Sequence, residues 1–231
     1  MKYFGEGLSE KHKELNQIIR KTDKIEQAKE LFLDIHAKLH LSEMSDTEYN
    51  EVDNLICDLS DNEYAIMPTA KDETIAWVIW HIARIEDLTM SVLVAGDNQL
   101  FNHEWEQKMN APVTDTGNSL NDDEIMNLSK SLVIRELLHY RNEVGKRTRQ
   151  IVQNLKSDDM KQKVSPHGLD KIMLEGGVTK QENSMWLLDF WSKKDIAGIL
   201  LMPPTRHVML HINDCCKWKE LFRTKKTFYR S

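Results

Sequence analysis

The 231-residue sequence contains few of the residues that interrupt helices, with only five prolines and nine glycines. It also lacks any sustained run in which apolar and polar residues alternate with β-branched enrichment, which is the pattern of half-buried strands. These two scarcities predict an all-α protein. A chain of this length buries a sizeable core without disulfide staples.

Cysteine is scarce as well. The three cysteines are Cys57 and the neighbours Cys215 and Cys216. Adjacent residues rarely bridge each other, so we expect reduced thiols in the cytosol. A soft metal held by the vicinal pair is a minor alternative.

The sequence has neither an apolar leader nor a hydrophobic run of membrane-spanning length. Mixed charges follow Met1, and the apolar segment 196–204 contains a glycine and two prolines and falls well short of roughly 20 residues. A net charge of −6 argues against a broad nucleic-acid footprint, and we expect the basic tail of about residues 219–231 to be a solvated, frayed helix end. The sequence therefore predicts a cytoplasmic protein that binds neither nucleic acid nor a membrane.

Apolar residues at helical spacing predict four long helices after a polar leader of about residues 1–21, all within one domain, 1–231. The expected long helices cover about 22–41, 72–95, 119–156 with a break near Ser131, and a final helix that begins or kinks at Pro204. A shorter helix or a pair of turns is expected at 47–62. The connection 98–118 should be irregular, and the connection 157–180 should hold short helices and loops. This pattern predicts a four-helix bundle with additional short helices in long connections.

Three histidines on the predicted helices are candidate metal ligands. His81 lies in the most apolar stretch of the chain, and His207 and His211 lie four residues apart, so a helix points both imidazoles the same way. A catalytic metal site typically uses three protein ligands and leaves one position open. Imidazole suits Zn, Ni, Cu and Fe, so the ligands do not identify the ion. Taken alone, His81 is better explained as a hydrogen-bonded core histidine than as a ligand, and the pair is as consistent with an ordinary helix face as with a metal site.

The other histidine pair at this spacing, His36 and His40, lies near the end of the first predicted long helix. Histidine there favours the negative end of the helix dipole, so we interpret the pair as capping or surface residues. Three carboxylates are candidates for orienting the metal ligands, although a solvated helix face is the better explanation for each of them. They are Glu86, Asp87 and Asp214, while Trp77 and Trp80 are expected in the core.

Other site chemistries lack their motifs. The His-Glu-x-x-His helix of zinc peptidases is absent, and Glu136-x-x-His139 is a single copy of a spacing that di-iron bundles need twice. Neither a phosphate-binding glycine loop nor a serine nucleophile elbow is present.

The segment Trp77-Val78-Ile79-Trp80-His81-Ile82-Ala83-Arg84-Ile85-Glu86-Asp87, followed far downstream by His207-x-x-x-His211, resembles the DinB/YfiT-like superfamily of four-helix-bundle metalloenzymes. That family places one histidine on its second long helix and a His-x-x-x-His pair on its fourth, and the resemblance extends from the first long helix to Trp218. Members often continue with an Arg-Gly-Gln-like run, where this chain has Ile212-Asn213-Asp214.

The resemblance implies a divalent ion, most often Zn or Ni, held by His81, His207 and His211, and it implies frequent dimers. Characterised members include transferases that use low-molecular-weight thiols, where the metal lowers the pKa of the thiol. We therefore expect a small-thiol transferase or a hydrolase that uses metal-bound water, acting on a small molecule. The alternative is a non-catalytic bundle that binds a metal, a small ligand or a protein partner.

Overall fold

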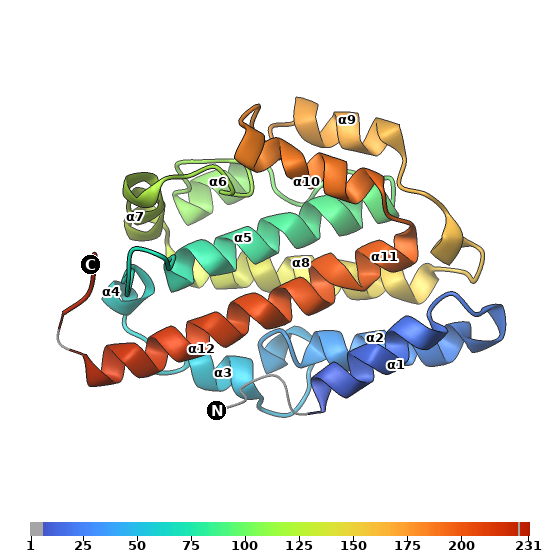
Figure 1. The fold of residues 1–231 in the computed structure, drawn as a ribbon, viewed down its shortest axis with the longest axis horizontal. Helices are drawn as coiled ribbons and strands as arrows, with labels where there is room; N and C mark the ends of the chain where they lie inside the picture. The colour runs from blue at the N-terminus through green and yellow to red at the C-terminus, as the bar shows by residue number, and fades with distance from the viewer. Residues whose placement is uncertain (1–6, 226) are drawn as a thin grey trace.

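A computed structural model describes residues 7–225 and 227–231, and all regular secondary structure in this part of the chain is helical. The predicted all-α bundle is confirmed. The four long elements are α2 (Ile25–Ala37), α5 (Ile75–Asp87), α8 (Ile134–Asn154) and α12 (Val208–Thr224). In Figure 1, α5 and α8 run side by side and α12 lies along α5, while α1 packs on α2, and α2 contacts the segment Met202–His207 that leads into α12.

The shorter helices occupy the connections between the long ones, and one of them, His103–Met109, lies in the segment 98–118 that was wrongly expected to be irregular. They are α3 (Glu51–Ile56), α4 (Asp61–Tyr64), α6 (His103–Met109), α7 (Asp122–Ser131), α9 (Pro166–Leu174), α10 (Glu182–Ser192) and α11 (Ile196–Leu200). The break between α7 and α8 falls at the predicted place, immediately after Ser131. None of the helices in the described residues has the length and apolarity needed to cross a membrane.

Helix α5 is the centre of the core, as its apolar sequence predicted. The helix begins at Thr74, whose hydroxyl accepts the backbone N–H of Trp77, and every residue from Ile75 to Asp87 is buried. A helix that is buried on all sides must satisfy each of its polar side chains inside the protein. The polar residues of α5 therefore mark the places where loops and neighbouring helices present hydrogen-bonding groups to it.

Both ends of the chain are more ordered than the sequence suggested. The segment expected as a polar leader contains α1 (Leu8–Ile18), which buries Leu8, Leu15 and Ile18. The tail expected to be frayed is fixed to the body, because Met67 and Arg230 exchange backbone hydrogen bonds. Lys219 and Arg223 both pair with Asp58. Acidic partners far away in sequence explain the order of this basic segment.

Of the two expectations for Pro203 and Pro204, that the last helix starts at Pro204 is wrong; the other, a kink there, stays a prediction. The π-helical segment Met202–His207 continues from α11 into α12, so the helical turns begin before the prolines. Proline removes a backbone donor, and the Thr205 hydroxyl compensates by donating to the Leu200 carbonyl at 2.8 Å. A second π-helical segment, Leu88–Val94, extends α5. Wide turns of this kind occur frequently at functional sites. Here one of them ends at the candidate ligand His207, and the other begins seven residues after His81.

Candidate metal centre

The His81 ring is held in one orientation by a loop. Its Nδ1 lies 2.9 Å from the Thr116 carbonyl oxygen, which can only accept, so Nδ1 carries the proton. The unprotonated Nε2 then faces away from the loop with a free lone pair. A hydrogen bond of this kind is the usual way in which proteins orient a metal-ligating histidine.

Three consecutive carbonyls of this loop receive donors from α5. Trp80 Nε1 donates to Asp115 at 2.9 Å, His81 to Thr116, and Trp77 Nε1 to Gly117 at 3.1 Å. The loop is therefore hydrogen-bonded to α5 along a full turn of the helix. Every residue carries a backbone carbonyl, so this arrangement could not be predicted from the residue types in the sequence.

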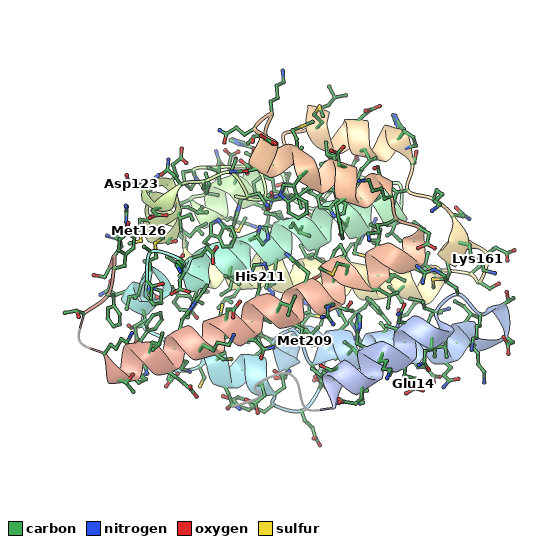
Figure 2. All side chains as sticks on the ribbon, viewed as in Figure 1. Glu14, Asp123, Met126, Lys161, Met209 and His211 are labelled. Carbon is green, nitrogen blue, oxygen red and sulfur yellow. The ribbon has the colours of Figure 1, made fainter. Side chains whose placement is uncertain are left out.

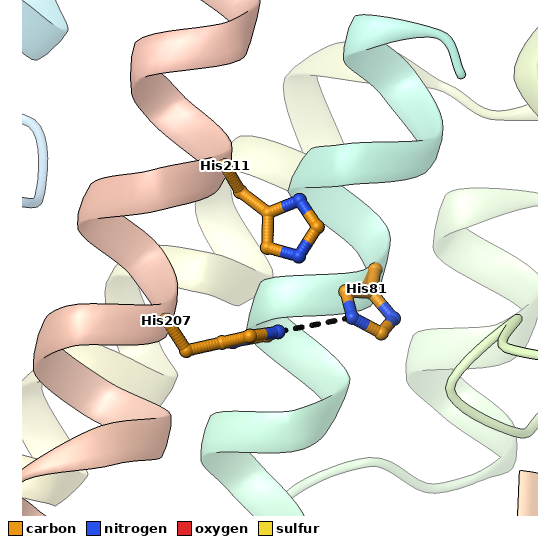
Figure 3. A group of neighbouring side chains, drawn as sticks. All are labelled: His81, His207 and His211. Carbon is orange, nitrogen blue, oxygen red and sulfur yellow. Dashed lines mark hydrogen bonds between the residues drawn. The ribbon is translucent and has the colours of Figure 1, made fainter. Parts of the chain in front are cut away.

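His207 and His211 reach the same point from the neighbouring helix, as Figure 3 shows. Their ring centroids are 4.5 Å apart, and they lie 5.1 and 5.0 Å from that of His81. The Nε2 atoms of His81 and His207 are 3.2 Å apart, and one ligand nitrogen from each ring lies within 4.8 Å of the others. Figure 2 shows His211 on α12 beside α5, while Glu14 and Lys161 lie on the periphery.

The proton positions show that the three rings fit a divalent ion. The His81 Nε2 lone pair faces Nε2 of His207 at 3.2 Å. The buried Nδ1 of His207 has no hydrogen bond of good geometry, although the nearby Pro203 carbonyl supports a proton on this ring. Hydrogen bonds within the protein thus leave ring nitrogens of this cluster without partners. An ion at the centre would accept one lone pair from each of the three rings.

All three rings are neutral at physiological pH. Burial lowers the pKa of His81 to about 3, with a contribution from His211, and it lowers the pKa of His211 to about 4. Burial and the two neighbouring rings hold the pKa of His207 well below its usual range. Metal ions bind the unprotonated form of imidazole, so no ring must first lose its charge.

Trp77 forms one wall of the centre. Its ring stacks on that of His81 with centroids 4.6 Å apart and an interplanar angle of 9°, and its centroid is 6.1 Å from that of His211. Trp77 and Trp80 are buried, as predicted for core residues. His207 and His211 are partly exposed, so the centre is open on the α12 side rather than sealed.

The three candidate carboxylates do not hydrogen-bond to these rings. Glu86 is buried and contacts two other histidines, and Asp87 is buried in a network with Arg84 and Tyr140. Asp214 is partly exposed and pairs with Lys217, although its charge raises the pKa of His211 slightly against the effect of burial. A solvated face is therefore the wrong interpretation for Glu86 and Asp87.

The interpretation of His36 and His40 as capping or surface residues is also wrong. Both rings are completely buried, and both face the Glu86 carboxylate on α5. His36 lies in the last turn of α2, but its ring points into the bundle and not toward the helix end. Burial, reinforced by the Arg141 charge, lowers the pKa of His40 to about 3.

Gly145 in the middle of α8 makes room for the His40 ring. A Cβ atom at this position would lie 2.9 Å from both Cε1 and Nδ1 of that ring. We expect Gly145→Ala to destabilise the protein by about 1–3 kcal/mol through overpacking, although alanine normally favours a helix. Urea unfolding checks this, and the same substitution in a His40→Ala background should cost less, because only the flexible Met44 side chain, with Cγ at 3.0 Å, then remains close. Equal losses in the two backgrounds would contradict the steric explanation.

Comparisons with known proteins agree with this fold. The model of the DinB superfamily matches residues 44–179, which include His81 but end before His207 and His211. One solved structure, that of a conserved protein from Enterococcus faecalis, is 14% identical, covers 86% of this chain and 97% of its own, and superposes with a TM-score of 0.57. At that identity the likeness concerns the fold alone. No curated protein matches the chain.

Proposed function

The chain belongs to the DinB superfamily, and from this premise and its converging imidazoles we propose that it is a divalent-metal-dependent enzyme. His81, His207 and His211 hold the ion, with Zn²⁺ or Ni²⁺ the expected metal. The observation that carries the proposal is the His81 ring, whose Nδ1 is fixed by the Thr116 carbonyl while its Nε2 faces His207 at 3.2 Å.

The reaction we propose is the transfer of a low-molecular-weight thiol to an electrophilic carbon of a small molecule. The thiol sulfur forms a bond to that carbon, a leaving group departs, and the thiol proton passes to solvent. A bound divalent ion supplies Lewis acidity and makes a thiol or water more acidic at neutral pH. The partly exposed side formed by His207 and His211 admits the substrate, and Trp77 shields the opposite side.

Hydrolysis by metal-activated water uses the same ligands and is the second enzymatic candidate. The non-catalytic alternative is a bundle that only binds a metal, a small ligand or another protein. We also propose a cytoplasmic protein that forms a homodimer and binds no nucleic acid, as the sequence and the family resemblance led us to expect.

Metal analysis tests the proposal first. We expect purified protein to regain a divalent ion after chelation and reloading, and His207→Ala with His211→Ala to lose the ion held by these rings. The loss follows because one histidine cannot retain the ion against chelation. His103→Ala, on the exposed surface of α6, is the matched control and should bind as the wild type does. Wild-type protein that cannot be loaded at all would refute the enzyme proposal.

A screen of small thiols against an activated alkyl halide separates enzyme from binder. Consumption of thiol should depend on the metal and disappear in the double variant. If the loaded protein releases product from ester or amide substrates in place of thiol transfer, hydrolysis replaces transfer as the assigned reaction. Loaded protein that is silent in both screens supports the binding-only alternative.

A further inference from the structure

A second histidine cluster lies on the other side of α5 from its loop contacts, five residues beyond His81. His36 Nε2 lies 2.8 Å from Oε1 of Glu86, and His40 Nε2 lies 3.2 Å from Oε2 of the same carboxylate. One ligand atom from each of the three residues lies within 4.8 Å of the others. Two imidazoles and one carboxylate form a common ligand set for divalent ions.

The two clusters are built in the same way. In each, a pair of histidines four residues apart approaches one residue of α5, and the ring centroids of the pairs are 4.3 and 4.5 Å apart. The α5 residue is a neutral imidazole in the first cluster and the Glu86 carboxylate in the second. About 7.5 Å of helical rise separates these two positions, and the Glu86 charge reaches His207, whose low pKa is set mainly by burial.

Hydrogen bonding satisfies only one nitrogen of each ring. Nδ1 of His36 and Nδ1 of His40 are buried and without a hydrogen-bond partner, as is Nδ1 of His207 in the first cluster. The rings are therefore oriented by what lies at Nε2. For an ion to bind at Nε2, the ring proton must move to Nδ1. This shift gives up the Nε2 hydrogen bond to Glu86, and the bonds of both residues to the ion take its place. No strong base is needed, since the ring stays neutral.

Arg141 from α8 is the nearest cation that affects this cluster. It is buried, donates to the Leu39 carbonyl, and the Glu86 carboxylate raises its pKa while burial lowers it to about 10. The Arg141 guanidinium thus donates its hydrogen bond to a backbone carbonyl. Among the described residues, no hydrogen bond joins it to Glu86. Both carboxylate oxygens remain directed at the two histidines.

From these observations we infer that His36, His40 and Glu86 form a second divalent-metal site, bound through Nε2 of both rings and a carboxylate oxygen. The site is fully buried, so it holds its ion without access for a substrate. Its role is to tie α2 to α5 beside the first centre. The inference does not depend on the proposed enzymatic function, because it concerns separate residues.

Cobalt binding tests the inference. Protein stripped with a chelator is titrated with Co²⁺, and bound metal is counted after dialysis while the visible absorption of the ion is recorded. We expect two ions per chain in the wild type and one in the His207→Ala, His211→Ala double variant. Glu86→Gln, which keeps an acceptor for the histidines, should also retain one ion, with the spectrum of the three-histidine site.

The affinity of the second site should fall by at least about 100-fold in Glu86→Gln, the upper end of the loss seen when even an outer partner is removed. Glu143→Gln on exposed α8 surface is the matched control and should bind two ions. If Glu86→Gln fails to fold by circular dichroism, His40→Gln replaces it. One ion per chain in the wild type, lost entirely in the double variant, would overturn the inference and leave a hydrogen-bonded core cluster.

Discussion

Replacing Asp87 by alanine should destabilise the protein by about 3–5 kcal/mol, the loss expected when one partner of a buried ion pair is removed. The Asp87 carboxylate is completely buried and accepts the Tyr140 hydroxyl at 2.7 Å and the backbone N–H groups of Leu100 and Phe101 at 2.8 and 2.9 Å. Arg84 lies 3.4 Å away. Without the carboxylate, these donors and the buried guanidinium lose their charge partner.

Urea unfolding measures this loss, and Asp87→Asn should give a smaller one because it keeps the side-chain shape and one acceptor oxygen. Asp189→Ala, at an exposed position of α10, is the control and should change stability by no more than about 0.5 kcal/mol. An Asp87→Ala protein as stable as the control would show that the network contributes nothing.

The same substitution should weaken metal binding, although Asp87 does not contact the three histidines. Arg84 donates to the Thr114 carbonyl, two residues before Thr116 in the loop between α6 and α7, and Asp87 lies beside the Arg84 guanidinium. Loosening this loop frees the His81 ring, and loss of such an outer partner costs about 10–100-fold in affinity. The stability and metal-binding effects should therefore appear together.

Periodicity and composition predicted the bundle because a helix that is buried on all sides must be apolar at nearly every position. The apolar run around His81 identified the central helix, and the spacing of His207 and His211 identified two side chains on one helix face. In both cases the decisive geometry lies within one helix, where sequence spacing and spatial position correspond.

Contacts between distant segments could not be predicted in this way. His36 and His40 have the same spacing as the other pair, but their partner Glu86 lies 50 and 46 residues away, and nothing local distinguishes a buried histidine pair from an exposed one. Gly145 was a usable signal for a side chain packed closely against α8. A glycine in the middle of a long helix lowers helix stability, and close packing is a common reason for it. The Thr116 carbonyl had no signal at all, since every residue has one.

Acid should destabilise the metal-free protein steeply between pH 6.5 and pH 3. Burial lowers the pKa of both His40 and His81 to about 3, with Arg141 adding to the effect at His40 and His211 at His81. In the unfolded chain each ring takes up a proton near pH 6.5. The unfolded state therefore binds more protons in this window, and stability present above pH 6.5 is lost progressively as the pH falls toward 3.

Each ring should contribute about 1.4 kcal/mol of lost stability per pH unit, which is about 2 kcal/mol per ring by pH 5. Urea unfolding in the presence of a chelator at pH 7, 6 and 5 measures the slope. His40→Gln removes one buried ring and should reduce the slope by about 1.4 kcal/mol per pH unit, whereas His103→Gln at the surface should preserve it. A slope unchanged by His40→Gln would mean that this ring is already protonated in the folded protein, paired as a cation with the Glu86 carboxylate.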